Sequence, residues 1–501
     1  MKDLAPNTPV IVGIGFVQEK RDDPATCAEP YRLMVDAVRR AAEDAGSRAV
    51  LRQIESIAVP QGGWDYPNPG QLIRDALGCP SARTILADLG VLQLSLLADL
   101  CRAIAAGERH VGVVTGGEAK YRVLRGARTG RPVFDTEQPE DAPPPDEHQT
   151  SSDPWCSDLE GRRGLSSPVE FFAIIESAVR HRRGIDVERH RDAVAALYGR
   201  FSEIAARNPH AWRREPVTAE VIRNPSPTNA MLAFPYTKLH STQWNVNQSV
   251  AILVCSAARA VQLGLRGAGS IYPLAAAHSK HVVPLAQQRR LDSHAGTVLS
   301  GERALALAGA SARDVTAAEL YSCFPAAVQS FAQDLRLDES CPWTVTGGMS
   351  FAGGPFNSAS LEGVARMVEV LREEARAGVS GRRIGLVSNL SGIFGKQACA
   401  LFSTEPNPDG YRFADVTEVV AARDIPLPLV ADHAGPATIV GYTVVFAGGL
   451  PSHAIAICDT PSGARTVVRS DEGALLDTMT REEFCGRAIE VARGGGFVVR
   501  R

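Results

Sequence analysis

The 501-residue chain lacks the features that would place it in a membrane, on a nucleic acid or among disulfide-rich proteins. No apolar run is long enough to cross a bilayer, and acidic and basic residues nearly balance at a net charge of −3. Ten cysteines are few for this length, and no two form a Cys-x-x-Cys pair. We therefore expect reduced thiols. The first residues carry no basic region or cleavage site, which predicts a cytoplasmic protein without a membrane or nucleic-acid partner.

Motifs for nucleotides and metals are incomplete. Residues 13–15 lack the third glycine of a dinucleotide fingerprint, and residues 391–397 lack the first glycine and the terminal Ser/Thr of a phosphate loop. His278, His281 and His294 are loosely spaced, with no cysteine or carboxylate pattern around them. Exposed loop histidines explain this spacing better than a metal site. The sequence therefore predicts neither a bound cofactor nor a metal.

Strand-like and helix-like segments alternate in the first part of the chain. Residues 10–16 have the pattern of a buried strand, residues 31–45 have one apolar stripe at helical spacing, and residues 54–59 have the pattern of the next strand. Alternation of this kind predicts an α/β fold, with a parallel sheet covered by helices.

Two pairs of segments resemble each other in the same order. Residues 44–57 parallel residues 307–324, where a helix ends in Ala-Gly before a strand, and residues 110–117 parallel residues 383–390. Any α/β protein contains helix–Gly–strand units, so either similarity alone is weak evidence for a duplication. Their matched order favours an internal duplication.

The chain is expected to divide into three parts. The N-terminal half covers residues 1–265, with an insertion of loops and helices at about 120–240, and the C-terminal half covers residues 266–405. Residues 137–154 are rich in Pro, Asp, Glu and Ser, which predicts an exposed, structureless loop. Short strands broken by glycines follow, and they predict a small antiparallel β-barrel at residues 411–501.

Three segments resemble the active-site loops of thiolases and occur in the same order. They are Tyr321-Ser322-Cys323-Phe324, residues 346–355 (TGGMSFAGGP) and residues 388–395 (SNLSGIFG). Residues 8–404 are similar to the thiolase superfamily, and with the β-rich tail the chain resembles the type-1 thiolase-like proteins, relatives of the sterol-carrier thiolases. The resemblance implies duplicated βαβαβαββ halves in five αβαβα layers, and a coenzyme A thioester as ligand.

The resemblance also implies where four catalytic groups should lie, and other residues occupy those positions here. Counting back from a helix end at Gly107 puts Gly90 in place of the nucleophilic cysteine. Tyr321 replaces a side chain that helps to hold a water or a thioester oxygen. Gly354 replaces the histidine that activates the nucleophile, and Asn389 replaces the cysteine that shuttles a proton.

These replacements argue against ordinary thiolytic cleavage. A thioester carbonyl needs a nucleophile, a base and oxyanion donors, and a glycine side chain supplies none of them. Asn389 does not titrate near neutral pH. Loss of a covalent nucleophile alone costs on the order of four to six powers of ten in rate. Backbone groups of Gly353, Ser391 and Gly392 are still expected to bind a thioester.

The sequence leaves three functions open. The chain is an acyl-CoA-binding protein that has lost covalent Claisen chemistry, an acyltransferase with relocated groups, or an assembly module that docks a protein partner through the C-terminal barrel. Relocated groups would be Ser95, Cys323 or Ser350 as nucleophile and His240 or Tyr321 as base, although Cys323 also fits a small buried thiol. Both a monomer and a homodimer are compatible with the sequence.

Overall fold

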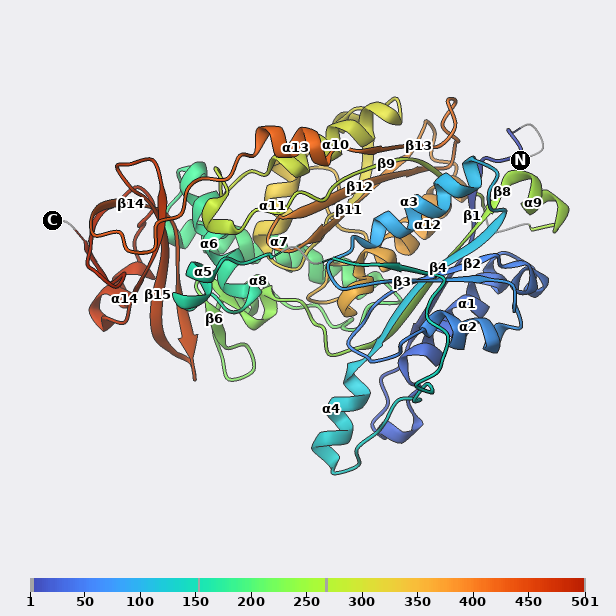
Figure 1. Cartoon of the computed structure of the whole chain (residues 1–501), viewed down its shortest axis with the longest axis horizontal. Helices are drawn as coiled ribbons and strands as arrows, with labels where there is room; N and C mark the ends of the chain where they lie inside the picture. The colour runs from blue at the N-terminus through green and yellow to red at the C-terminus, as the bar shows by residue number, and fades with distance from the viewer. Residues whose placement is uncertain (1–3, 152–153, 266–268, 500–501) are drawn as a thin grey trace.

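The computed structural model of the chain describes residues 4–151, 154–265 and 269–499, and its strands form three sheets (Figure 1). The first sheet has the order β1 (Pro9–Gln18), β8 (Asn247–Ser256), β4 (Val111–Ala119), β2 (Ser56–Pro60), β3 (Arg83–Ala87) and β5 (Glu147–Gln149). The second has the order β10 (Val315–Glu319), β11 (Ile384–Ser391), β12 (Lys396–Ser403), β9 (Tyr272–Ser279) and β13 (Arg412–Asp415). None of the described helices is long and apolar enough to span a bilayer.

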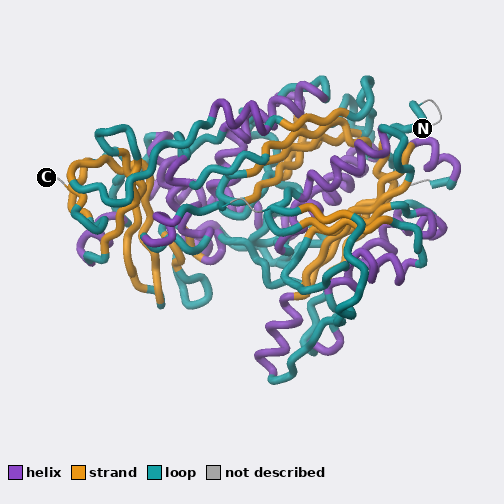
Figure 2. The backbone as a smooth tube through the Cα atoms, viewed as in Figure 1, coloured by secondary structure: helices purple, strands orange, loops and turns teal. Residues whose placement is uncertain are grey.

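Helices cover and separate the first two sheets, which gives five layers. The outer face of the first sheet carries α1 (Pro30–Asp44) and α2 (Pro69–Leu77). Between the two sheets lie α3 (Gln93–Ala105) and α12 (Ala359–Arg376). The outer face of the second sheet carries α10 (Ala295–Leu307), with α11 (Pro325–Asp334) beside it. Figure 2 shows the two sheets with helices between them. A continuous apolar core fills the central layer. This is the expected αβαβα arrangement.

Glycines in β1 explain the motif at residues 13–15. A Cβ on Gly13 would lie 1.9 Å from the carbonyl oxygen of Ala41, and a Cβ on Gly15 would lie 2.0 Å from that of Ala37. Both carbonyls belong to α1, so the missing side chains let this helix lie directly on the strand. The motif therefore serves helix–sheet packing.

The two sheets have the same strand arrangement, as the two pairs of similar segments in the sequence predicted. The order β1-β8-β4-β2 in the first sheet corresponds to β9-β12-β11-β10 in the second. In both, a parallel pair (β2 with β4, β10 with β11) is followed by antiparallel strands. The similar segments at residues 110–117 and 383–390 correspond to β4 and β11, which have equivalent places in the two sheets. The duplication is thus present in the fold.

Residues 137–154 are largely an exposed loop, as predicted, but they also contain a short strand that the sequence did not predict; residues 152 and 153 lie outside the described residues. Within them β5 pairs in parallel with β3 at the edge of the first sheet. The Asp146 carboxylate accepts hydrogen bonds from the Thr84 N–H (2.7 Å) and hydroxyl (3.1 Å), and Asn68 Nδ2 donates to the Pro143 carbonyl (3.1 Å). These tertiary bonds compensate for a sequence that is poor in apolar residues.

The rest of the first-half insertion is mainly helical. It contains α4 (Lys120–Thr129), α5 (Asp158–Arg162), α6 (Pro168–Arg183), α7 (Val187–Arg207), α8 (Ala219–Arg223), β6 (Met231–Ala233) and β7 (Tyr236–Thr237), and α9 (Ala257–Gln262) follows β8. Serine or aspartate caps several of these helices, for example Asp186 at the start of α7, which accepts from the Arg189 N–H.

A third, antiparallel sheet forms the C-terminal unit. Its order is β16 (Arg465–Ser470), β15 (Leu450–Asp459), β14 (Gly435–Ala447), β17 (Ala488–Val491) and β18 (Phe497–Val499), accompanied by α13 (Thr417–Arg423) and α14 (Gly473–Met479). The insertion contributes β6, which pairs with β14 at Ala233 and Val445. A closed barrel is not confirmed: among the described strands the two edges do not pair, and one backbone bond joins Arg469 to Gly495.

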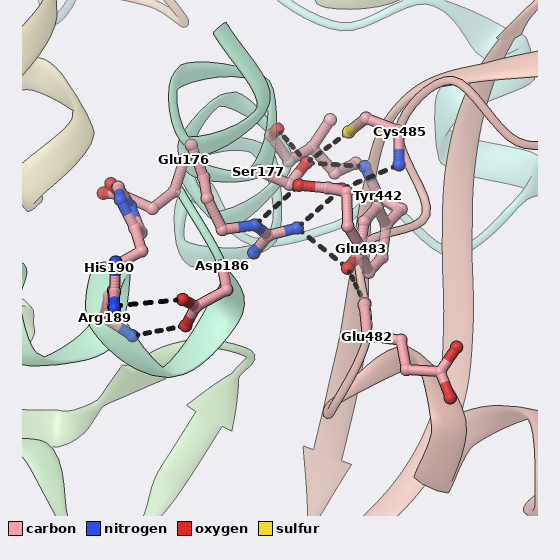
Figure 3. Close-up of polar contacts among 11 residues, drawn as sticks. Glu176, Ser177, Asp186, Arg189, His190, Tyr442, Glu482, Glu483 and Cys485 are labelled. Atoms are coloured by element: carbon pink, nitrogen blue, oxygen red, sulfur yellow. Dashed lines mark hydrogen bonds and ion pairs between the residues drawn. The ribbon is translucent and has the colours of Figure 1, made fainter. Parts of the chain in front are cut away.

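A buried arginine fixes the C-terminal unit to α6. Arg180 donates to the Glu483 carboxylate (2.9 and 3.0 Å) and to the Tyr442 hydroxyl (2.8 Å), and its side chain is 1% exposed. Ser177 Oγ accepts from the Tyr442 N–H at 2.9 Å, and Figure 3 shows Ser177 beside Tyr442, Glu483 and Cys485. The contact therefore combines a charge-assisted pair with hydrogen bonds between neutral groups.

Candidate functional site

A cavity of about 710 Å³ lies where loops from both halves and the insertion meet. Six residues predicted from the thiolase-like loops line it: Gly90, Tyr321, Cys323, Gly354, Ser391 and Gly392. Much of the remaining wall is apolar, with side chains that include Phe172, Val282, Phe324, Met349, Leu390 and Ile393. The fold thus brings segments from distant parts of the sequence to one cavity.

The other predicted positions lie outside the cavity wall. Gly353 lies against Gln248, and a Cβ on it would be 2.0 Å from Gln248 Oε1. The Asn389 side chain is directed to the start of α3, where its Oδ1 accepts from the Leu94 N–H at 3.2 Å. Asn389 therefore satisfies a helix N-terminus.

His240 is held away from the cavity by its own turn. Its Nδ1 accepts from the Thr237 N–H at 3.2 Å, and its ring lies between those of Tyr198 and Tyr236, with centroids 5.6 and 5.8 Å away. Burial lowers the pKa of His240 to about 4, against a weaker opposite effect of the Glu176 carboxylate. His240 is neutral and does not line the cavity, so this geometry gives it no direct role as a base there.

Cys323 and Tyr321 do reach the cavity, but as neutral groups. Burial raises the pKa of the Cys323 thiol and of the Tyr321 phenol well above their ordinary values. A thiolate forms readily only where a positive group or a helix N-terminus lowers the thiol pKa. Cys323 therefore has the character of a packing thiol, and Tyr321 that of a hydrogen-bond donor.

Ser95 lies in a chain of polar groups that runs from the interior to the exposed Asp415. Its Oγ is 2.8 Å from His278 Nδ1, and His278 Nε2 is 3.2 Å from Asp415 Oδ2. The order resembles a catalytic triad, but none of the three lines the cavity, and burial lowers the pKa of His278. Ser350, the remaining nucleophile candidate, is also buried outside the lining.

The expectation of exposed loop histidines is wrong for two of the three. His278 lies within β9, and His294 is buried with its ring stacked on Phe394 at 3.6 Å between centroids. His281 is half-buried, with Nε2 3.2 Å from the Asp424 carbonyl oxygen. In the described part of the chain, no three His, Cys, Asp or Glu side chains form a group that could hold a metal ion.

Two glycines of the wall leave no room for a side chain. Gly90 has φ = +96°, and a Cβ on it would lie 2.8 Å from Ser151 Oγ. A Cβ on Gly354 would lie 2.3 Å from Thr242 Cγ2. Ser151 and Thr242 thus occupy the space that side chains at positions 90 and 354 would need.

Sequence reasoning missed Ser151 and Lys396, and it did not single out Thr242. Ser151 comes from the Pro-rich segment after β5, and Thr242 follows the turn at Lys238–His240. Lys396 Nζ donates to Ser151 Oγ at 2.5 Å, and its side chain lines the cavity although it is 7% exposed. The only available signal was the position of Lys396, one residue after the loop at 388–395.

Some wall residues have polar atoms that no described residue satisfies. The Ser360 N–H donates to Gln93 Oε1 (2.8 Å), which fixes that amide, so Gln93 Nε2 donates to Asn357 Oδ1 (3.3 Å). This orientation leaves Asn357 Nδ2 without a partner, and Ser241 Oγ also has none. Unpaired buried polar groups are rare, and they indicate a ligand or water at this wall.

Large apolar side chains surround the cavity mouth. Leu89, Trp155, Trp244 and Phe356 are between 38% and 44% exposed, and all four line the cavity. Lys120 Nζ lies 2.8 Å from the ring centroid of Trp244. Exposed apolar groups concentrated at one opening are typical of a binding site.

A second cavity, of about 870 Å³, lies between α6, α7 and the region of α11. It is lined by Arg183, Arg200, Arg336 and neighbouring apolar side chains, and by none of the residues predicted from the thiolase-like loops. The first cavity is therefore the candidate site, although it is the smaller of the two.

The chain has a thiolase-like fold according to solved structures. It is similar to a monomeric SCP2-thiolase-like protein type 1 from Mycobacterium smegmatis, with 25% identity over 99% of this chain and 100% of that chain and a TM-score of 0.80. It is also similar to the Ltp2-ChsH2(DUF35) aldolase, with 18% identity over 80% of this chain and 99% of that chain and a TM-score of 0.58. The dimeric peroxisomal thiolase of Saccharomyces cerevisiae has the same identity and coverages, with a TM-score of 0.54. No protein-family profile and no curated protein sequence matches it.

Proposed function

We propose that this thiolase-like chain binds an acyl-CoA thioester in the 710 Å³ cavity and does not catalyse ordinary thiolytic cleavage. The observation that carries the proposal is the lining itself, which joins six thiolase-like loop positions to apolar walls. Volumes of about 300 to 1,000 Å³ with a few convergent polar groups are typical of small-molecule sites.

The wall supplies a partner for each part of such a ligand. Phe172, Phe324 and Met349 offer apolar surface to the acyl chain, and Asn357 Nδ2 is the donor that we assign to the thioester carbonyl oxygen. At the mouth, the Trp244 ring provides a surface for the adenine, and nearby Lys120 a cation for the phosphates.

The arginine-rich segments are engaged elsewhere in the protein. Arg180 is buried against Glu483, while Arg182 and Arg290 both pair with Asp292. None of these arginines lines the cavity. The phosphate contacts are therefore assigned to the mouth and not to these basic runs.

The case against thiolysis rests on space as well as chemistry. At Gly90 and Gly354 the side chains of Ser151 and Thr242 fill the places of a nucleophile and its base. Neither glycine can accept a cysteine or histidine side chain unless these neighbours move. We expect no coenzyme A-dependent cleavage of acetoacetyl-CoA.

The occupied edge of the first sheet favours a monomer. The added strand β5 pairs with β3, so β3 no longer offers a free edge to a second copy. The mycobacterial relative is described as monomeric and the yeast thiolase as dimeric. Sedimentation of the purified chain as a single monomeric species is the expected result.

Calorimetric titration with acetyl-CoA and with free coenzyme A tests the binding proposal. Val282 lines the cavity, and Val282→Trp should fill it and abolish saturable binding. Val261, 39% exposed on α9, provides the matched control, because Val261→Trp adds the same ring to the surface. Absence of binding by the unmodified chain at millimolar ligand, or equal affinity in both variants, would contradict the proposal.

A further inference from the structure

Ser151 and Lys396 form a close pair within the cavity wall. Lys396 Nζ donates to Ser151 Oγ at 2.5 Å, and both residues line the cavity. Lys396 opens β12 directly opposite Ser391 of β11, so the hairpin fixes its backbone. The Ser151 Oγ that accepts this hydrogen bond lies 2.8 Å from the place of a Cβ on Gly90.

The Ser151 hydroxyl lies where a thiolase-like nucleophile would lie. A Cβ on Gly90 would be 2.8 Å from Ser151 Oγ and 3.1 Å from Ser151 Cβ. A hydroxyl at this distance occupies nearly the same volume as a short nucleophilic side chain at position 90. Any ligand whose carbonyl carbon approaches position 90 therefore meets the oxygen of Ser151.

The lining also limits which group could take a proton from that hydroxyl. Of the described side chains that line the cavity, Tyr321, Cys323 and Lys396 are the titratable ones, and no described histidine, aspartate or glutamate is among them. Only Lys396 is hydrogen-bonded to Ser151 among the described residues. A serine paired with a lysine is an established alternative to the Ser-His-Asp arrangement.

We propose that Ser151 is an acyl-accepting nucleophile and Lys396 its proton acceptor. This inference rests on acyl-CoA binding in the same cavity. Ser151 Oγ forms a bond to the thioester carbonyl carbon while its proton passes to the Lys396 amine. The carbon–sulfur bond then breaks, coenzyme A leaves as the thiolate, and the Lys396 ammonium returns the proton to the sulfur. The products are an acyl-serine ester and free coenzyme A.

Mass spectrometry of the full chain after incubation with acetyl-CoA tests the step. We expect one added acetyl group, located on the peptide that contains Ser151 and stable to neutral hydroxylamine, which cleaves thioesters faster than oxygen esters. Ser151→Ala should abolish the adduct, whereas Ser95→Ala, at a serine outside the cavity wall, should retain it. Lys396→Arg keeps a hydrogen-bond donor but cannot accept the proton, so its acetylation rate should fall at least a hundredfold.

Calorimetry with the same variants separates this inference from the binding proposal. Ser151→Ala and Lys396→Arg should still bind acetyl-CoA, which also shows that they are folded. Binding without an adduct in the unmodified chain, an adduct on another residue, or an unaltered rate in Lys396→Arg would overturn the inference and leave the binding proposal intact. Absence of binding by the unmodified chain would remove both.

Discussion

At Gly90 two independent constraints meet, a left-handed backbone and a neighbour in the place of a side chain. The residue has φ = +96°, and its absent Cβ would contact Ser151 Oγ at 2.8 Å. Gly90→Ala should lower the free energy of unfolding by about 2–4 kcal/mol, the sum of the backbone cost of about 1–2 kcal/mol and a similar packing cost. Chemical denaturation measures this change.

Gly78 provides the matched control for this substitution. It ends α2 with φ = +71°, and a Cβ there would meet no atom within 4 Å. Gly78→Ala should therefore show only the backbone cost, about 1–2 kcal/mol. Equal losses in the two variants would show that Ser151 does not fill the space beside Gly90.

His240 should make the protein less stable in acid. Burial holds its pKa at about 4 in the folded state, against 6.5 for an ordinary histidine. The unfolded chain therefore binds the proton more tightly between these values, and stability present above pH 6.5 is lost as the pH falls toward 4, by up to about 3 kcal/mol.

His240→Asn tests this contribution to acid sensitivity. The asparagine Oδ1 replaces Nδ1 as the acceptor for the Thr237 N–H, which keeps the turn, but it does not titrate. Urea unfolding between pH 4 and 7 should show a shallower loss of stability in the variant. Parallel curves would mean that His240 does not carry the effect, because His294 and Asp334 titrate equally in both proteins.

At the residue scale, the sequence predicted Gly90, Tyr321 and Gly354 at the cavity, but it missed Ser151 and included Gly353 and Asn389, which do not line it. The loop positions follow local motifs, so their order along the chain was sufficient to find them. Ser151 reaches the cavity only because β5 pairs with β3 and turns the following residues inward. A contact that depends on pairing of distant strands leaves no local pattern.

At the scale of elements, Asn389 links β11 to the start of α3. Its Oδ1 accepts from the Leu94 N–H at 3.2 Å, and the preceding N-cap residue, Leu92, has no side-chain acceptor. Asn389→Ala should cost about 1 kcal/mol in the free energy of unfolding, as loss of a helix cap does. Acetyl-CoA affinity should stay unchanged because Asn389 does not line the cavity.

Ser256 supplies the comparison for Asn389. It caps α9 from the adjacent position, with its Oγ accepting from the Arg259 N–H at 3.3 Å, and Ser256→Ala should cost a similar amount. A much larger effect of Asn389→Ala on ligand affinity than on stability would instead place Asn389 in the binding site.

Long elements were predictable from periodicity, while short paired strands were not. The expected helix at residues 31–45 is α1 (Pro30–Asp44), since its apolar stripe alone buries one face. By contrast, β5 has three residues, Glu147, His148 and Gln149, whose composition is that of a loop. Such a strand exists because β3 offers it a hydrogen-bonding edge, which is a property of the folded sheet.

At the scale of the whole molecule, the C-terminal sheet is continuous with the insertion that walls the cavity. The insertion strand β6 pairs with β14, and α6 lies against the same sheet. Leu232 of β6 and Phe172 of α6 both line the cavity. A C-terminal module that only docked a partner would not need to share a sheet with the segment that lines the cavity. The shared sheet therefore favours a structural role for the C-terminal unit at the site.

Arg180 is the residue whose loss should separate the C-terminal unit from the rest. Arg180→Ala leaves the Glu483 carboxylate, 29% exposed, without its charged partner and should destabilise the unit by about 2–3 kcal/mol. The five tryptophans all lie before residue 344, so their fluorescence reports the part of the chain that precedes the C-terminal unit, whereas far-UV circular dichroism reports the whole chain.

The two probes should therefore diverge in the variant. In the unmodified chain we expect the two unfolding transitions to coincide. In Arg180→Ala the circular-dichroism transition should precede the fluorescence transition. This variant should also bind acetyl-CoA more weakly, because α6 and β6 are no longer covered by the C-terminal sheet. Arg487, which pairs with Glu482 on the surface of the same unit, is the control: Arg487→Ala should cost less than 1 kcal/mol and leave the probes coincident. Coincident transitions in Arg180→Ala would show that other contacts hold the unit in place.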